Sequence, residues 1–144
     1  MLNKKFKSVT VNSVEGKVLS EISEREIDSL SDGDVTISVE YSCLNYKDAL
    51  AITGKGKIMR NFPCIAGIDL SGKVIESQSE NFKEGDKVVA TSYDIGVAHD
   101  GGLSEIARIP SEWIVKLPEN LTTKESMYYG TAGYTAALAI ERLE

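Results

Sequence analysis

The sequence predicts a mainly β protein, a barrel or a sandwich of short strands, with one long helix at its C-terminal end. Short segments with apolar residues near every second position recur at intervals of about ten residues, without internal repeats. Residues 34–44, DVTISVEYSCL, alternate cleanly and form the clearest strand pattern of the chain. Residues 122–144 change to an alanine-rich helical pattern.

The N-terminal part predicts three strands. Two of them, at residues 8–13 and 16–22, are joined by a turn at Glu15-Gly16. Residues 23–34 are polar and end in an Asp32-Gly33-Asp34 turn, so we expect them to form a connection. In the third strand, at residues 34–44, one face carries the apolar residues, which are Val35, Ile37, Val39, Tyr41 and Cys43.

The central part predicts a short helix and further short strands. Residues 46–53 favour about two turns of helix, ended by the glycines and lysines of residues 54–57. A strand runs through residues 70–75, and another follows the Glu84-Gly85-Asp86 turn. After the glycine pair at residues 101–102, two short strands flank Pro110.

The C-terminal helix has a recognisable start. Thr122 and Glu125 have the spacing of a capping box, so we expect one helix from residue 122 to the last residue. Gly130 and Gly133 each cost about 1 kcal/mol relative to alanine in a helix, so a structural reason should require them. The helical pattern runs to residue 144 without a C-cap, which suggests a fragment boundary.

Length, charge and cysteines limit the function classes. The 144 residues predict one domain, and the formal net charge of −6 argues against non-specific nucleic-acid binding. No apolar run approaches the roughly 18 residues that cross a bilayer, and residues 1–13 have no signal-peptide pattern. Cys43 and Cys64 have no CxxC spacing, so we expect free thiols and a cytoplasmic protein.

Residues 45–48, Asn-Tyr-Lys-Asp, are the strongest candidate site, and two interpretations stay open. Asn45 as N-cap and Asp48 three residues later would begin a helix. Tyr46 at a junction between a loop and a helix could instead stack on a flat ring and donate a proton. Lys47 is expected to be a solvated neighbour.

Other motifs are weak. Residues 54–57, Gly-Lys-Gly-Lys, lack the Walker A pattern, although Lys55, Lys57 and Arg60 could touch a phosphorylated substrate. His99 is the single histidine, with only Asp100 beside it, which is a poor basis for a zinc site. The GTAG of residues 130–133 lies within a helix and is not a dinucleotide-binding fingerprint.

Four stretches together carry a family resemblance: SCLNYKDALAITGKGKIMRNFPCIAGIDLSGKV, FKEGDKVVATSY, DGGLSEIARIPSEWIVKLP and MYYGTAGYTAALAIERLE. They closely resemble the YhdH/YhfP-type quinone oxidoreductases of the medium-chain dehydrogenase/reductase superfamily, which include acrylyl-CoA reductases. The resemblance is continuous over residues 34–144 and looser over the first 30. It implies a GroES-like, partly open β-barrel catalytic domain at residues 1–121, and a helix at 122–144 that leads towards an absent NADPH-binding Rossmann domain.

The resemblance also implies a reductase that works without zinc. Zinc-dependent members have a catalytic cysteine three residues before an aspartate, and later Gly-His-Glu. Asn45 and Gly67-Ile68-Asp69 look like the corresponding positions, and Cys43 is two residues out of register. No metal-binding residue is therefore predicted.

The resemblance further implies that NADPH delivers hydride to a small conjugated carbonyl, such as a quinone or acrylyl-CoA. Tyr46 and Asn45 are the predicted catalytic residues, as proton donor and polar orienter, because an enolate without a metal needs hydrogen-bond donors. Tyr46, Asp48 and Thr131 are the predicted cofactor-binding residues. The fragment alone is expected to be inactive and the full-length protein a homodimer; the alternative is a GroES-like, non-catalytic binding module.

Overall fold

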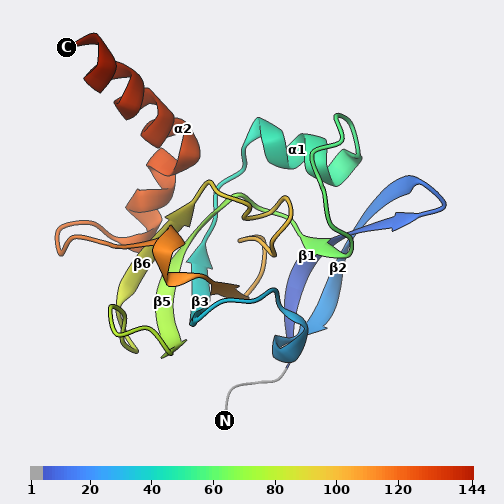
Figure 1. The fold of residues 1–144 in the computed structure, drawn as a ribbon, viewed down its shortest axis with the longest axis horizontal. Helices are drawn as coiled ribbons and strands as arrows, with labels where there is room; N and C mark the ends of the chain where they lie inside the picture. Colours follow the sequence, from blue (N-terminus) through green and yellow to red (C-terminus); the bar gives the residue numbers. More distant parts are fainter. Residues whose placement is uncertain (1–4) are drawn as a thin grey trace.

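The computed structural model describes residues 5–144, and its strands form two sheets (Figure 1). The smaller sheet has the strand order β2-β1-β4, where β1 is Lys5–Val14, β2 is Lys17–Glu26 and β4 is Cys64–Ile65. The larger sheet has the order β7-β3-β5-β6-β8. Its strands are β3 (Val35–Tyr41), β5 (Asp69–Ser77), β6 (Lys87–Thr91), β7 (Ile106–Ile109) and β8 (Ile114–Lys116). All pairings between these strands are antiparallel, and within the described strands the sheets do not close into a barrel.

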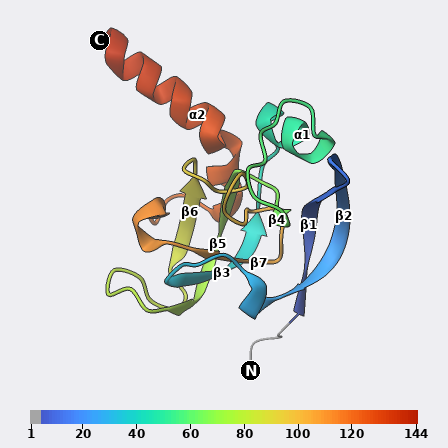
Figure 2. The same ribbon diagram turned by 45° about the vertical axis from the view of Figure 1, so that its right-hand side comes forward.

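Two helices accompany the sheets. Helix α1 (Tyr46–Thr53) packs against β2, and α2 (Thr123–Leu143) packs against β3, β5 and β6. The buried residues of α2 all lie in its first part, and Figure 2 shows its C-terminal end standing away from the sheets. Two 3-10 turns, Ile27–Ser29 and Ser111–Trp113, complete the described elements. Within residues 5–144, no helix is long and apolar enough to cross a membrane.

The main core lies on the larger sheet. Its fully buried members include Ile37, Leu70 and Ile109, from three neighbouring strands. Burying each such side chain contributes about 1.5–3 kcal/mol to folding. A second cluster joins Val11 of β1 and Ala51 of α1, so the short helix is held over the smaller sheet. This packing fixes the position of the loop that precedes α1.

The predicted strand at residues 34–44 is confirmed, with shorter bounds and a partly wrong alternation. Val35 and Ile37 are buried as predicted, but Tyr41 is exposed and Thr36 is buried. The pairing register between β3 and β5 shifts after Thr36 and again between Val39 and Tyr41. Such irregularities change which face a side chain occupies, so strict alternation fails.

Two other predicted elements need correction. The connection expected at residues 23–34 begins too early, because β2 continues to Glu26 by pairing with Lys5–Ser8. Most residues of β2 face solvent, so the alternation of apolar residues that marks a strand is absent from its last part. The prediction of one uninterrupted C-terminal helix is also wrong in one respect. Gly130 has a non-helical backbone (φ 49°, ψ −157°) and divides α2 at a kink.

Candidate active site

The loop before α1 is held by a buried carboxylate. The Asn45 N–H donates to Asp48 Oδ2 (2.7 Å), and the Ile68 N–H donates to Asp48 Oδ1 (3.0 Å). Asp48 is 1% exposed, and the helix begins at Tyr46 with Asn45 as its N-cap residue. The interpretation of Asn45 and Asp48 as the helix start is confirmed, and Asp48 also ties α1 to the chain before β5.

Tyr46 is the first residue of α1 and is 80% exposed. Its ring lies at a helix N-terminus, next to a loop that hydrogen bonds hold in place. Lys47 is exposed, as expected for a solvated neighbour. An exposed phenol on a fixed loop can offer a ring face for stacking and a hydroxyl proton for donation.

Asp69, the first residue of β5, is the centre of a hydrogen-bond cluster that the sequence did not predict. It is fully buried. Its Oδ2 accepts from Cys43 Sγ (2.9 Å), from Asn45 Nδ2 (2.8 Å) and from the Thr131 N–H (2.9 Å). Its Oδ1 accepts from Thr131 Oγ1. The structure therefore brings together Asn45 and Thr131, two predicted site residues, on one carboxylate.

Gly130 has a positive φ, and the chain passes very close to this cluster at that residue. A Cβ atom at residue 130 would lie 2.5 Å from Cys43 Sγ and 2.7 Å from Asp69 Oδ2. Gly133 is close to the preceding turn, since its Cβ would lie 2.8 Å from Cβ of Tyr129. Close packing around the kink thus explains why residues 130 and 133 are glycines despite their cost in a helix.

The cluster keeps Cys43 protonated. Burial, and then the Asp69 carboxylate that accepts a hydrogen bond from Cys43 Sγ, raise the pKa of the Cys43 thiol from 9.0 to about 12. Zinc sites in proteins use three or four cysteine, histidine or carboxylate ligands, whereas this cluster offers one cysteine, one carboxylate and an amide. No group of three or more His, Cys, Asp or Glu residues among residues 5–144 is arranged to hold a metal ion. The side chains at this site therefore do not fit zinc.

His99 lies outside this cluster. Its Nδ1 is 2.9 Å from the Asp100 carbonyl oxygen and its Nε2 is 2.8 Å from that of Asp32. The ring is buried and meets Trp113 edge-on at 5.2 Å between centroids. His99 thus holds the loop at residues 99–100 against the Asp32 backbone and the Trp113 ring.

The glycine–lysine segment after α1 forms a turn. Gly54 has a left-handed backbone and is the C-cap of α1. Lys55 and Lys57 are exposed. The prediction of a flexible turn rather than a phosphate loop fits this geometry.

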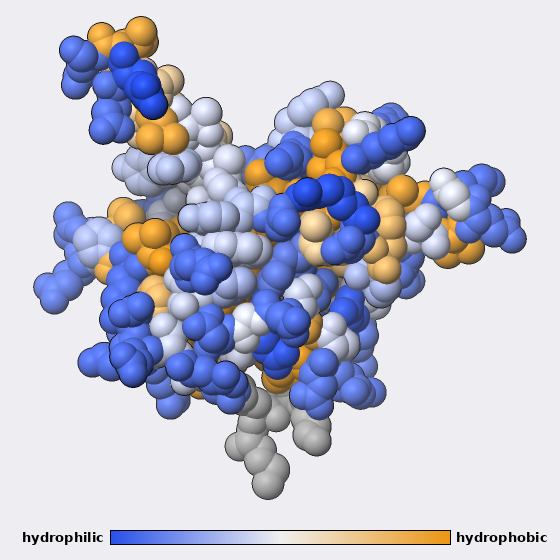
Figure 3. Space-filling view, viewed as in Figure 1, coloured by the Kyte–Doolittle hydropathy of each residue, from blue (hydrophilic) through white to orange (hydrophobic). Residues whose placement is uncertain are grey.

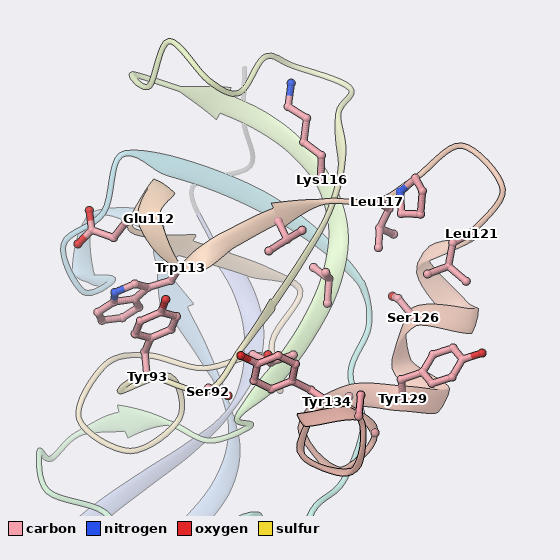
Figure 4. A pocket seen from close by; sticks show the side chains of 17 residues that line it. Ser92, Tyr93, Glu112, Trp113, Lys116, Leu117, Leu121, Ser126, Tyr129 and Tyr134 are labelled. Carbon is pink, nitrogen blue, oxygen red and sulfur yellow. The ribbon is translucent and has the colours of Figure 1, made fainter. Parts of the chain in front are cut away.

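A cavity of about 610 Å³ lies between the β6–β8 edge of the larger sheet and α2 (Figure 4). Tyr93 stacks on Trp113 at one side, with 5.1 Å between ring centroids, and Tyr134 of α2 lies on another side. Gly130 and Gly133 belong to its wall, whereas residues 45–48 do not. The cavity and the Asp69 cluster therefore meet at the kink of α2.

The fold is one that a known family shares. The sequence model of one protein family, the alcohol dehydrogenase GroES-like domain, matches residues 31–119, which is more than half of the chain. The chain belongs to this family. The predicted GroES-like, mainly β fold class is thereby confirmed.

Individual relatives are more specific. The chain is 56% identical over 110 residues to YhfP of Bacillus subtilis, assigned as a quinone oxidoreductase, and the match covers 76% of this chain and 33% of that protein. It is 43% identical over 141 residues to the acrylyl-CoA reductase AcuI of Ruegeria pomeroyi, covering 96% of this chain and 43% of that protein. The YhdH oxidoreductase of Salmonella enterica in complex with NADP has a TM-score of 0.92 and 45% identity, over 95% of this chain and 42% of that one.

These matches confirm the resemblance to the YhdH/YhfP-type oxidoreductases of the medium-chain dehydrogenase/reductase superfamily. The chain spans between a third and just over two fifths of the length of these relatives. The roles of Asn45, Tyr46, Asp48 and Thr131, and the division at residue 121, stay predictions.

Proposed function

We propose that this chain is the catalytic domain of an NADPH-dependent reductase of quinones or of conjugated carbonyls such as acrylyl-CoA. The observation that carries the proposal is the likeness over 95% of the chain to an oxidoreductase crystallised with NADP. The 43% identity to an acrylyl-CoA reductase supports the substrate class. In this proposal residues 1–121 form the catalytic domain, and residues 122–144 lead to a Rossmann domain that binds most of the cofactor.

The surface of α2 supports this division. Leu138, Ile140 and Leu143 in its last part are exposed, and Figure 3 shows hydrophobic and hydrophilic residues side by side on the projecting end. Exposed apolar side chains on one element are typical of a surface that packs against another part of a protein. The nearby glycine segment at residues 130–133 is crowded by Cys43, Asp69 and Tyr129, so it leaves little room for the cofactor's phosphates there.

Bound NADPH would supply a hydride to the electron-poor carbon of the substrate. Tyr46 would lie against the nicotinamide and donate a proton as negative charge develops on the carbonyl oxygen. Asn45 holds this loop rather than donating to the substrate, because its Nδ2 already donates to Asp69 (2.8 Å) and to Asp48 (3.4 Å). Asp48 fixes the start of α1.

Thr131 is proposed to contact the cofactor where the two domains meet. Its N–H and its hydroxyl proton are both engaged by Asp69. A contact with the cofactor would therefore use the Thr131 methyl group or a lone pair of Oγ1. We further propose a cytoplasmic enzyme, in keeping with its two free cysteines, and a homodimer of the full-length protein.

The test is NADPH oxidation by the protein expressed from its complete reading frame, with acrylyl-CoA and a simple benzoquinone in parallel. Turnover of either substrate supports the proposal, and the ratio of the two kcat/KM values identifies the preferred class. The 144-residue chain is the control. It should bind NADPH only in the millimolar range, about 4 kcal/mol, since in this proposal the helix N-terminus that binds the pyrophosphate belongs to the Rossmann domain.

Absence of both turnover and NADPH binding in the full-length protein would refute the proposal. The non-catalytic binding module would then be the better explanation. Micromolar NADPH binding by the 144-residue chain would contradict the proposed division of the cofactor site.

A further inference from the structure

We infer that Asp69 is a positioning residue that fixes Tyr46 relative to Thr131, and so sets the geometry at the reactive end of the cofactor. The inference rests on the function proposed above. It is carried by the contacts of one buried carboxylate with the two segments on which Tyr46 and Thr131 lie.

The carboxylate of Asp69 is used to its capacity within the protein. An ionised carboxylate has room for about four hydrogen bonds, and Asp69 accepts four, from Cys43, Asn45 and twice from Thr131. No Lys, Arg or His among the described residues forms an ion pair with it. A buried carboxylate is costly to leave unpaired, so each of these donors is held firmly in place.

On one side Asp69 caps a helix. Because Gly130 is non-helical, the part of α2 from Thr131 onward begins anew, and its first N–H groups lack carbonyl partners within the helix. The Thr131 N–H donates to Asp69 instead (2.9 Å). A carboxylate at a helix N-terminus is also favoured by the helix dipole. Asp69 thus stabilises the kink and places Thr131.

On the other side Asp69 holds the loop of Tyr46. Asn45 precedes Tyr46, and its Nδ2 lies between Asp69 Oδ2 (2.8 Å) and Asp48 Oδ2 (3.4 Å). The Asn45 N–H is fixed to Asp48 as well. Movement of this loop relative to α2 would break a hydrogen bond to a buried charge. A misplacement of about 1 Å between reacting groups can lower a rate about 10²-fold, so this connection has a kinetic consequence.

The main test is Asp69→Asn in the full-length protein. Asparagine keeps the size but replaces one acceptor oxygen by an amino group that faces other donors. We expect kcat to fall about 30- to 100-fold, while the KM for NADPH changes less than about threefold, because the phosphate contacts that dominate binding lie elsewhere. Asp100→Asn is the matched control, since Asp100 is also buried and accepts from Ser31 and from the Ile65 N–H. Equal kcat losses in the two variants would overturn the inference.

A second pair of variants covers the case that Asp69→Asn does not fold. Thr131→Val removes the hydroxyl donor, and Thr131→Ser retains it. We expect a several-fold loss of kcat in Thr131→Val that Thr131→Ser restores; wild-type kcat in Thr131→Val would count against the inference. Where Asp69→Asn folds, the double variant with Thr131→Val should be no slower than Asp69→Asn alone, and fully additive losses would contradict the coupling.

A measurement independent of activity separates this inference from the proposed function. Hydrogen exchange of the Thr131 amide in the 144-residue chain should accelerate at least tenfold in Asp69→Asn and stay unchanged in Asp100→Asn. If the full-length wild type turns over no substrate, the proposed function fails, and accelerated exchange still supports the connection through Asp69. Unchanged exchange in Asp69→Asn would overturn the inference whatever the activity.

Discussion

Replacing Gly130 by alanine tests the kink of α2 directly. The new Cβ atom would lie 2.5 Å from Cys43 Sγ and 2.7 Å from Asp69 Oδ2, at a backbone φ of 49° and ψ of −157°. Alanine is strained in this region of backbone space, which costs about 1–3 kcal/mol. Forcing a methyl group into a packed site costs about 1–3 kcal/mol more. We therefore expect Gly130→Ala to lower the free energy of unfolding by about 2–6 kcal/mol, a large part of the typical stability of a domain.

The assay is urea unfolding of the 144-residue chain. Gly16→Ala and Gly85→Ala are matched controls, because both glycines have positive φ but a Cβ would have no neighbour within 4 Å. They should lose about 1 kcal/mol from backbone strain alone. The excess loss in Gly130→Ala over these controls combines the contact with Cys43 and Asp69 and the greater strain of the Gly130 backbone.

A further variant identifies the contact. Cys43→Ala removes the sulfur atom that the new methyl group would meet, so the double variant Cys43→Ala with Gly130→Ala should be less unstable than the sum of the single variants. Suppose instead that Gly130→Ala loses no more than Gly16→Ala, within about 0.5 kcal/mol. The close approach at the kink would then be absent, and the reasoning about Asp69 would lose its structural basis.

Three other predictions concern the site. In the full-length protein, Tyr46→Phe should lower kcat about 10²–10³-fold. Tyr46→Ala should in addition raise the KM for NADPH. A Tyr46→Phe enzyme with kcat within about threefold of the wild-type value would show that the hydroxyl has no chemical role. Elemental analysis of protein purified without added metal should find no stoichiometric zinc, because the cluster around Asp69 lacks suitable ligands; one tightly held zinc per chain would contradict this. Burial raises the pKa of the Cys64 thiol from 9.0 to about 12. This thiol should therefore leave the free energy of unfolding unchanged below pH 9, and its own contribution should fall by about 1.4 kcal/mol per pH unit between pH 9 and 12. Cys64→Ala should remove that slope, whereas the partly solvated Cys43 should contribute a smaller one.

The local elements of this fold were predictable because their signals lie within a few residues. Asn45 and Asp48 stand three residues apart and begin α1, and Thr122 and Glu125 do the same for α2. The turn at Glu15-Gly16 joins β1 to β2 as expected. Each of these features depends on contacts between neighbours in the chain, and such contacts leave a pattern in the sequence.

The centre of the site was not predictable in the same way. Asp69 and Thr131 are 62 residues apart, and the hydrogen bonds between them exist only after the sheet and α2 have packed. The one local signal was Gly130, a residue that a helix disfavours, and it indicated that some close contact was needed without saying with what. The end of β2 was missed for a related reason, since its partner residues Lys5–Ser8 lie across the hairpin.

The Asn45–Asp69 contact gives a physical reason to expect that this site works without a metal ion. The family resemblance places these two residues where zinc-dependent members carry ligands, so a metal would have separated them. Here Asn45 Nδ2 donates directly to Asp69 Oδ2 over 2.8 Å. The partial positive charges of that amide, of the Thr131 N–H and of the helix behind it stabilise the buried carboxylate in place of a cation. In the proposed function, the electrophile that zinc would provide for a carbonyl oxygen is replaced by the hydroxyl of Tyr46, which is exposed on the loop that Asp69 and Asp48 hold.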